Sequence, residues 1–259
     1  MFLPDNSTKF VLEVIMNQIN ELAGMIESSS RIVFFGGAGV STESGIPDFR
    51  SENGVFNAIR NYGYPPEDLL SIELFNRKPD IFFRYYNDLL LTTDAKPNYA
   101  HIALAKLEEL GKLSAVVTQN IDGLHQKAGS RNVFELHGSI HRNYCVKCHR
   151  FFDAEYVKNH SGIPYCPCGG IVKPDVVLYG ESLDSKTLRG AITSISRADM
   201  LIVGGTSLQV YPAAGLIDYY EGNKLVLINK SSTPYDGYAN LTIHEPIGVV
   251  MKAVMEQIN

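Results

Sequence analysis

The four cysteines of the chain lie in two close pairs and have the spacing of metal ligands. Cys145 and Cys148 form a C-x2-C pair, and after seventeen residues Cys166 and Cys168 form a C-x-C pair. Four thiolates at this spacing are typical of a closed tetrahedral zinc site, which is structural because no coordination position stays open. Since the second pair is shorter and Pro167 is stiff, we expect some strain or weaker binding there.

Two alternatives to a four-cysteine zinc site stay open. Imidazole also binds zinc, so His149 or His160 could replace one thiolate. The segment could also have lost the metal and be held together by packing alone.

A glycine turn follows the apolar run 32–35 and has features of a phosphate site. The turn has the sequence GAGVS at 37–41. Glycines let backbone N–H groups approach a dinucleotide diphosphate, and the N-terminus of a following helix adds positive potential. Thr42 stands where the usual fingerprint has a third glycine, so a turn without a ligand is an equally good interpretation of this motif alone.

Polar side chains follow several apolar runs that we interpret as strands. The carboxyl ends of parallel strands meet at one edge of an open α/β sheet, where such sheets bind ligands. A second glycine turn, Gly204-Gly205, follows the run 200–203. We therefore expect the following residues to surround one ligand: Asp48, Phe49, Arg50, Gln119, Asn120, Asp122, His137, Thr206 and Ser207.

Alternating strands and helices are expected to position these residues. Apolar residues at spacings of three and four predict a helix over 9–27, and further helical patterns cover 101–110 and 188–195. Such alternation implies right-handed βαβ units, hence an α/β fold with a doubly wound, parallel, Rossmann-like sheet. The expected strands are 32–35, 113–117, 133–136, 200–203 and 225–228.

Two segments interrupt the alternation and are predicted to form a smaller domain. Residues 53–96 are rich in aromatic side chains and suit a helical module, and residues 141–173 hold all four cysteines as a zinc module. The Rossmann-like dinucleotide-binding domain would then comprise residues 1–52, 97–140 and 174–259.

The composition excludes several classes of protein. The 259 residues include 45 % hydrophobic residues, 23 Lys+Arg and 28 Asp+Glu, for a formal net charge of −5, which is a globular composition. No cluster of Lys and Arg suits counterion release from a nucleic acid. The apolar runs are far shorter than the roughly 20 residues that cross a bilayer, and the start MFLPDNSTKF has no export signal. We therefore expect a cytoplasmic protein.

Together the motifs resemble those of the sirtuins, the family of NAD-dependent protein-lysine deacylases. They stand in the order found in the family and span nearly the whole chain, although the C-x-C pair departs from the family's C-x2-C by one residue. The matching stretches are GAGVS at 37–41, GIPDFRS at 45–51, TQNIDGLH at 118–125, HG at 137–138, KPDVVLYGE at 173–181, GTSLQVYP at 205–212 and LINK at 227–230.

The resemblance implies an NAD-dependent protein-lysine deacetylase. Such an enzyme cleaves nicotinamide from NAD and transfers the acetyl group of acetyl-lysine to ADP-ribose, giving deacetylated lysine, nicotinamide and O-acetyl-ADP-ribose. The expected partners are NAD and acetyl-lysine proteins or peptides, with no nucleic acid and no membrane. A structural zinc is expected besides NAD.

The resemblance also implies a role for particular residues. His137 would be the general base that removes a ribose hydroxyl proton, Asn120 would position a ribose hydroxyl or water, and Asp122 would bind the nicotinamide carboxamide. The expected NAD-binding residues are Gly37, Ala38, Ser41, Asp48, Phe49, Arg50, Gln119, Asn120, Ile121, Asp122, Gly205, Thr206, Ser207, Asn229 and Lys230. An acyl peptide would pair as a strand with Val177, Leu178, Tyr179, Gly180, Glu181 and Val210.

Other functions stay open at this point. A protein mono-ADP-ribosyltransferase would use the same NAD cleavage, although His137 and Asn120 together favour deacylation. A zinc ribbon for nucleic acid, a non-catalytic NAD sensor and a hydride-transferring dehydrogenase are further alternatives with less support from the motifs.

The aromatic segment 53–96 indicates which kind of acyl group the enzyme would accept. Sirtuins that prefer acidic acyl groups resemble one another in a Tyr-x-x-Arg pair, whereas Asp88 and Leu89 stand three residues after Tyr85 and Tyr86 here. We therefore expect an acetyl or similar neutral group as the substrate. Tyr85 and Tyr86 themselves are expected to be core residues.

Overall fold

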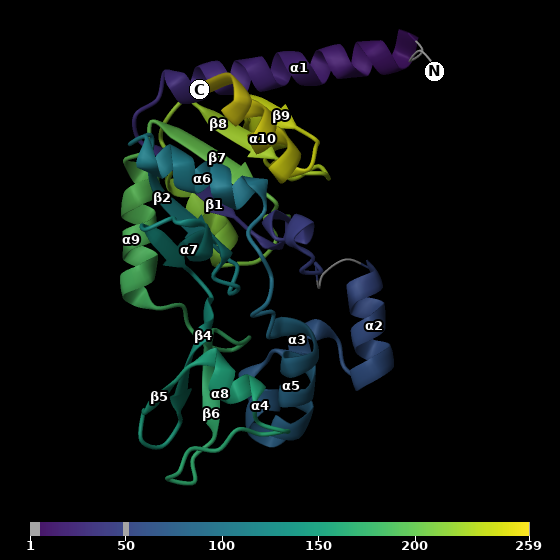
Figure 1. Cartoon of the computed structure of the whole chain (residues 1–259), viewed down its shortest axis with the longest axis vertical. Coiled ribbons are helices and arrows are strands. Elements are labelled where there is room, and N and C mark those ends of the chain that lie inside the picture. The colour runs from purple at the N-terminus through teal and green to yellow at the C-terminus, as the bar shows by residue number, and fades with distance from the viewer. Residues whose placement is uncertain (1–5, 49–51, 259) are drawn as a thin grey trace.

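A six-stranded parallel sheet forms the centre of the larger part of the molecule (Figure 1). The computed structural model describes residues 6–48 and 52–258. The strands run in the order β3-β2-β1-β7-β8-β9, so the order reverses between β1 and β7 and creates a topological switch point. Their bounds are β1 (Ile32–Gly36), β2 (Leu113–Thr118), β3 (Val133–Glu135), β7 (Met200–Gly204), β8 (Leu225–Ile228) and β9 (Leu241–Ile243).

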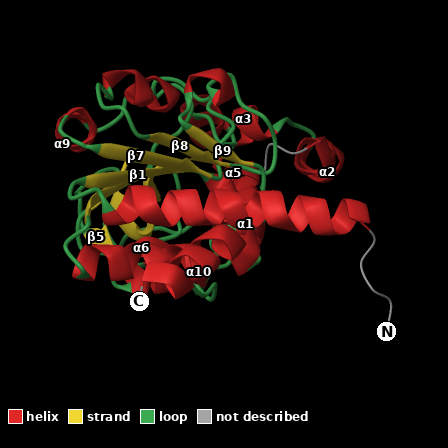
Figure 2. Ribbon diagram, turned by 90° about the horizontal axis from the view of Figure 1, so that it is seen from above, coloured by secondary structure: helices red, strands yellow, loops and turns green. Residues whose placement is uncertain are grey.

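Helices cover both faces of this sheet (Figure 2). Along β1 the side chains alternate, so Phe34 joins the core on one face and Phe35 joins the core on the other. Burial on both faces explains why the parallel strands are continuous apolar runs. One face is covered by α1 (Asn6–Glu27), α6 (Tyr99–Glu109) and α10 (Ile247–Ile258), and the other by α9 (Ser185–Ser196) and the 3-10 segment η4 (Ala213–Tyr219).

The predicted α/β class and doubly wound sheet are confirmed. All five expected strands and the three expected helices are present, with bounds that differ by a few residues at most. The sequence patterns did not predict β9, which has only three residues, or α10. The N-terminal N–H of Gly248 in α10 donates to the distant carboxylate of Glu43, so this helix start has no local capping signal.

A smaller unit lies beside one edge of the sheet, at the bottom of Figure 1. Its helices enclose an aromatic core in which Tyr85 and Tyr86 are both 0 % exposed, as predicted. The elements are α2 (Glu52–Tyr62), α3 (Pro66–Leu69), α4 (Ile72–Arg77), α5 (Pro79–Tyr85), the π segment η3 (Tyr86–Leu90), β4 (Gly138–Cys145), β5 (Phe151–Phe152), α8 (Ala154–Lys158) and β6 (Val172–Val176).

The smaller unit contains an antiparallel sheet that the sequence did not predict. Its strands run in the order β5-β4-β6. Strands β4 and β6 both continue across the predicted domain boundaries at 140/141 and 173/174. The division of the chain into domains therefore stays a prediction.

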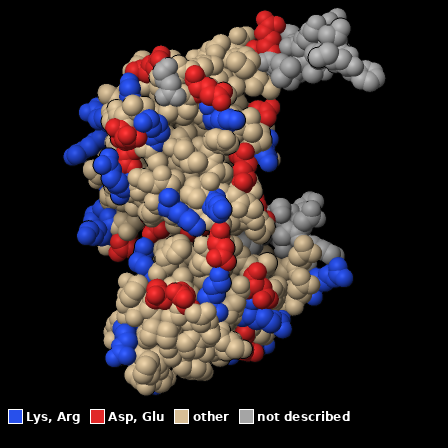
Figure 3. All heavy atoms as spheres, in the orientation of Figure 1, with Lys and Arg blue, Asp and Glu red and all other residues tan. Residues whose placement is uncertain are grey.

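On the face of the molecule drawn in Figure 3, the Lys and Arg side chains are interspersed with Asp and Glu side chains. No helix in the described part of the chain is both long enough and apolar enough to cross a membrane.

Candidate active site

The two glycine turns pack against each other at the switch point of the sheet. The N–H of Gly39 donates to the carbonyl of Gly205 at 2.8 Å, and the N–H of Gly37 donates to that of Gly204 at 3.3 Å. A Cβ added to Gly39 would lie 2.8 Å from the Cα of Gly205, and one added to Gly205 (φ 59°) would lie 2.3 Å from the nitrogen of Val40. These glycines are therefore required by the contact between the turns, whether or not a ligand binds.

A buried hydrogen-bond network joins the loop after β1 to the loop after β2. The Ser41 hydroxyl donates to Oδ2 of Asp122 at 2.7 Å, and Nδ2 of Asn120 donates to Oγ of Ser41 at 3.0 Å. The other carboxylate oxygen of Asp122 accepts from the N–H of Leu124 at 2.9 Å. Ser41 is 1 % exposed and Asp122 7 % exposed, so the predicted catalytic amide and carboxylate are fixed in place.

His137 stands beside this network, two residues after the end of β3. Its Nδ1 lies 3.0 Å from the carbonyl oxygen of Gln119, the residue before Asn120. A carbonyl oxygen only accepts, so Nδ1 carries the proton of the neutral ring and Nε2 is its basic atom. The tautomer that a general base needs is thus set by the backbone of the β2 loop.

Histidines also pack behind Asp122. The rings of His101 and His125 lie 4.7 Å apart between centroids, and both residues are almost fully buried. Burial lowers the pKa of His101 to about 4, against an opposing effect of Asp122, and burial lowers the pKa of His125 well below its ordinary value. His141 Nε2 lies 3.0 Å from the backbone oxygen of Asp122. The neutral rings of His101 and His125 and the hydrogen bond of His141 thus support the loop that carries Asp122.

A cavity of about 230 Å³ opens at the carboxyl ends of β7, β8 and β9. The hydroxyl group of Thr206, which lies on its wall, accepts a hydrogen bond from Nε2 of Gln119 at 3.1 Å. Its wall combines glycine backbone, hydroxyls, an amide and an ammonium group, which suit a diphosphate, with the carboxylates of Asp48 and Glu245, which suit ribose hydroxyls. The predicted NAD-binding residues on its wall are Asp48, Gly205, Thr206, Ser207, Asn229 and Lys230.

Two functional candidates were missed in the sequence. Glu245 lines the same cavity, two residues after β9. Its carboxylate suits ribose hydroxyls, whereas the residue that follows β8, Asn229, is not an acid. The signal was an acid two residues after the segment Leu241–Ile243, which is too short to be identified as a strand. Glu43 accepts from the N–H of Gly248 at 2.7 Å and so ties the first glycine turn to α10. No local signal could have shown that contact.

The remaining predicted NAD-binding residues differ in placement. Gly37 and Ala38 begin the turn after β1, and Ala38 is exposed. Ile121 is half-buried and packs against the core of the smaller unit. Phe49 and Arg50 lie outside the described residues.

The predicted peptide-binding segment 177–181 is already paired along part of its backbone. The N–H of Val177 donates to the His137 carbonyl at 3.0 Å, and the N–H of Tyr179 donates to the Leu70 carbonyl at 2.9 Å. Peptide pairing with this segment would therefore use its other backbone groups.

Glu181 turns its side chain back to the same segment. Its carboxylate accepts from the N–H of Leu178 at 2.8 Å and from Nζ of Lys173 at 3.0 Å. The Lys173 ammonium also donates to the carbonyl of Val176 at 3.0 Å. The ion pair between Lys173 and Glu181 thus stabilises the turn at 177–181. Within this turn Gly180 adopts a φ of 91°.

Val210, the other residue predicted to contact the peptide, lies on the loop between β7 and η4. Its carbonyl accepts from the N–H of Ala214 at 2.8 Å, which anchors the loop to η4. Leu208 holds φ 57° while 3 % exposed, an uncommon backbone conformation for a branched residue. The buried side chain of Leu208 and the bond to Ala214 thus hold this part of the loop against the larger unit.

The four cysteines come together as predicted. The sulfur atoms of Cys145 and Cys168 lie 3.4 Å apart, those of Cys148 and Cys166 3.6 Å apart, and all four lie within 4.8 Å of one another. Tetrahedral zinc with Zn–S bonds of about 2.3 Å requires sulfur separations of about 3.8 Å. The donor set and its spacing therefore fit a structural zinc ion.

The short C-x-C arm reaches the cluster through a tight turn. The N–H of Gly169 (φ 78°) donates to the carbonyl of Cys166, and the N–H of Cys166 donates to that of Gly170, both at 2.8 Å. Among the described residues the cluster contains cysteines alone, so neither His149 nor His160 replaces a ligand.

Asp88, which stands where an acidic acyl group would require arginine, is exposed. Its carboxylate accepts from the hydroxyl of Tyr62 at 2.8 Å. It therefore offers no positive charge to a succinyl carboxylate, and the expectation of a neutral acyl group stays a prediction.

The fold and the site define a Rossmann-like, dinucleotide-binding class of protein. A family model described as the Sir2 family matches residues 37–212. A curated NAD-dependent protein deacetylase of Clostridium perfringens is 62 % identical over 242 residues, covering 93 % of this chain and 99 % of the relative. One from Clostridium acetobutylicum is 60 % identical over 244 residues, covering 93 % and 100 %.

A solved structure of a Sir2 protein is also similar to this chain. A Sir2 protein in complex with a p53 peptide and NAD+ matches with a TM-score of 0.82 at 40 % identity, covering 92 % of this chain and 98 % of that one. The chain belongs to the Sir2 family, the sirtuins.

Proposed function

We infer that this chain is an NAD-dependent protein-lysine deacetylase. It uses NAD to remove the acetyl group of acetyl-lysine and yields deacetylated lysine, nicotinamide and O-acetyl-ADP-ribose. The observation that carries this inference is the buried network of Ser41, Asn120 and Asp122, with His137 bonded to the neighbouring Gln119 carbonyl. The network brings an amide, a carboxylate and a base to the ligand-binding edge of the sheet.

The cavity beside the glycine turns supports binding of the adenosine and diphosphate part of NAD. The hydroxyls of Thr206 and Ser207 would donate to phosphate oxygens, and the ammonium group of Lys230 would balance their charge. Asn229 and Glu245 would bond ribose hydroxyls at the far end of the cavity. NAD supplies the ribose carbon whose bond to nicotinamide breaks.

The chain's own groups would then orient the reacting atoms and move one proton. Asp122 uses one oxygen for Ser41 and the other for Leu124, yet a carboxylate has further lone pairs with which to hold the nicotinamide amide. Asn120 would position a ribose hydroxyl or water, and Nε2 of His137 would take the hydroxyl proton. A base with an ordinary pKa near neutrality suits this step.

Three further assignments concern the peptide, the metal and the location of the protein. An acetylated peptide would lie between the segment 177–181 and Val210, and the cysteines would hold a structural zinc. The grouping of all four cysteines as a metal cluster is typical of a reducing compartment, which supports a location in the cytoplasm.

A labelled-NAD experiment tests the function. The protein would be incubated with NAD labelled in the adenylate part, with and without an acetyl-lysine peptide, and a matched peptide bearing unmodified lysine would serve as the control. We expect nicotinamide release only with the acetylated peptide, and label in a small product. Label fixed to protein without peptide dependence would instead indicate a mono-ADP-ribosyltransferase.

A further inference from the structure

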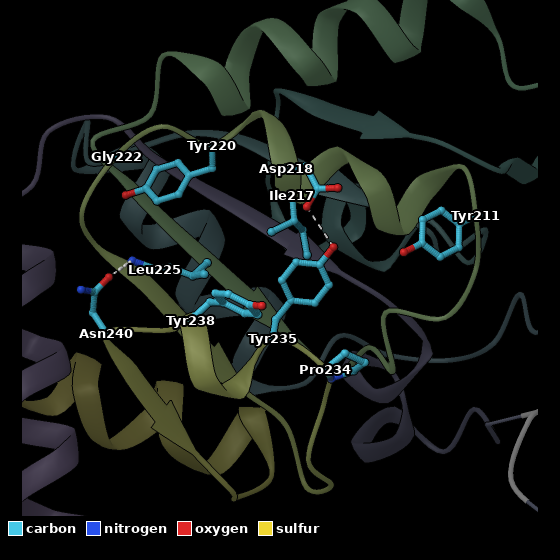
Figure 4. Close-up of a pocket in the computed structure, with 10 residues that line it drawn as sticks. All are labelled: Tyr211, Ile217, Asp218, Tyr220, Gly222, Leu225, Pro234, Tyr235, Tyr238 and Asn240. Carbon is cyan, nitrogen blue, oxygen red and sulfur yellow. Dashed lines mark hydrogen bonds between the residues drawn. The ribbon is translucent and has the colours of Figure 1, made fainter.

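A second cavity, of about 590 Å³, lies apart from the candidate NAD site and is walled largely by tyrosines (Figure 4). It is bounded by η4 and by the segment that leads from β8 to β9. The rings on its wall belong to Tyr211, Tyr220, Tyr235 and Tyr238. None of the assigned roles uses this cavity.

The wall of the cavity carries a negative charge. Asp218 is the acidic residue on its wall, and no Lys, Arg or His is among the lining residues that the structure describes. The Asp218 carboxylate accepts from the hydroxyl of Tyr235 at 3.0 Å, as Figure 4 shows. Burial, together with this bond, raises the pKa of Tyr235 to about 12, so the phenol is a neutral donor.

Aromatic faces beside a carboxylate attract a cation. A guanidinium or ammonium group gains from the quadrupole of each ring and from the negative charge. A phosphate or another anion would face the Asp218 carboxylate without any basic partner on the wall. Tyr211 and Tyr238 are 68 % and 79 % exposed, so their ring faces are accessible to a ligand.

The cavity adjoins the expected path of the substrate. Tyr211 follows directly on Val210, the residue that we expect to contact the acyl peptide, and η4 begins two residues later. Tyr211 thus places one wall of the cavity next to the expected path of the peptide.

We propose that this tyrosine-lined cavity binds an unmodified Lys or Arg side chain of the protein substrate, near the acetyl-lysine in sequence. The proposal rests on the deacetylase function. It makes the cavity a specificity subsite that selects acetyl-lysines in basic surroundings.

A peptide series tests the proposal on the full-length protein. Each peptide would carry one acetyl-lysine among neutral residues and a single Arg moved through every flanking position, with Gln at that position as the control. Binding would be measured by fluorescence anisotropy of a labelled peptide, and kcat and KM by nicotinamide release. We expect Arg at one or two adjacent positions to lower Kd and KM about five- to thirty-fold, with little change in kcat.

Two variants connect this gain to the cavity. Asp218→Asn keeps an acceptor for Tyr235 but removes the charge, and Tyr238→Leu removes an exposed ring. Each is expected to lose most of the gain from Arg and to leave the Gln peptide unchanged. Glu256→Gln, at the exposed end of α10, removes the same charge elsewhere and is expected to keep the gain.

Equal affinity for the Arg and Gln peptides at every position would overturn the proposal. So would a gain from Arg that survives both Asp218→Asn and Tyr238→Leu. Absence of turnover with every acetylated peptide would contradict the deacetylase function instead, and the anisotropy measurement would still decide whether the cavity binds a cation.

Discussion

The sheet edge and the cysteine-bearing segment hold their functional residues in different ways. At the sheet edge, the buried bonds of Ser41 with Asp122 and Asn120 are supported by cores on both faces. Around the cysteines the elements are short, since β5 has two residues and α8 has five. Phe151 and Tyr165 there are 54 % and 51 % exposed. The first site is held by packing on both faces of the sheet, whereas we expect the second to need a bound metal in addition to its packing.

The comparison implies that each site can lose its structure while the other stays folded. Loss of zinc should release the cysteine segment and leave the sheet folded. Loss of a polar group at the sheet edge should stop the chemistry and leave the cysteine segment intact. The separation can be tested by four changes, from the one with the largest expected effect on folding or activity to the one with the smallest.

Removal of the metal is expected to have the largest effect. Structural zinc sites contribute an apparent binding free energy of about 10–16 kcal/mol, so a chelator or Cys168→Ser should open the segment 141–173. Activity should also fall, because β4 begins directly after His137. Zinc per chain and hydrogen exchange would be measured, with β1 and β2 expected to stay protected. Wild-type protein that is free of zinc yet fully active would refute the assignment.

His137→Ala is expected to have the next largest effect. Loss of a general base lowers kcat by about 10²- to 10⁴-fold. NAD binding and the zinc content should both be retained, because the imidazole lies outside the diphosphate cavity. His149→Asn is the matched control, since His149 is exposed and Asn tolerates its φ of 56°. Full turnover in the His137 variant would remove His137 from the mechanism.

Ser41→Ala is expected to have a moderate effect. It removes one hydrogen-bond partner from the buried carboxylate of Asp122 and one from the half-buried amide of Asn120, which costs about 1–3 kcal/mol of unfolding free energy. Turnover should fall roughly in proportion, about tenfold or more, because both groups lose their orientation. Urea unfolding and kcat/KM would be measured beside Ser114→Ala, whose exposed hydroxyl donates to a strand carbonyl away from the site. Equal behaviour of the two variants would argue against the network.

Near neutral pH the buried histidine pair gives the smallest effect, which appears as a pH dependence of stability and grows as the solution is acidified. Because the folded-state pKa values of His101 and His125 lie below 6.5, the unfolded chain binds more protons, and stability is lost as pH falls from about 6.5 towards 4. Each histidine contributes at most about 1.4 kcal/mol per pH unit. His125→Leu should reduce this slope by one proton.

The same variant should keep or raise the unfolding free energy at pH 7. Both ring nitrogens of His125 are buried without a hydrogen-bond partner among the described residues, and leucine removes them. Urea unfolding at several pH values measures both quantities. An unchanged slope in His125→Leu would show that this imidazole is already charged in the folded protein.

The sequence predicted those elements whose burial follows a simple period. The run 32–35 is buried on both faces and is continuous in apolar residues, so β1 was predictable. Strand β4 was not, because Asn143 is fully buried and Arg142 is bonded to Glu135 and Asp175. Their polar side chains interrupt the alternation that marks a strand.

The site was predictable to the extent that its motifs follow strand ends. The residues Gln119 to Asp122 and His137 come after β2 and β3, and parallel strands bring such positions to one edge. Glu245 and the bond of Glu43 to Gly248 depend on how distant segments meet, which no local pattern encodes.

The contact between the two glycine turns has a consequence for mutational scans. Alanine at Gly39 or Gly205 would push the turns apart before any ligand is present. Such a variant would lose NAD affinity together with thermal stability, and so would be scored as a binding mutant for the wrong reason. Affinity losses at Ser207 or Lys230, whose side chains are exposed, are the ones that would report contact with the dinucleotide.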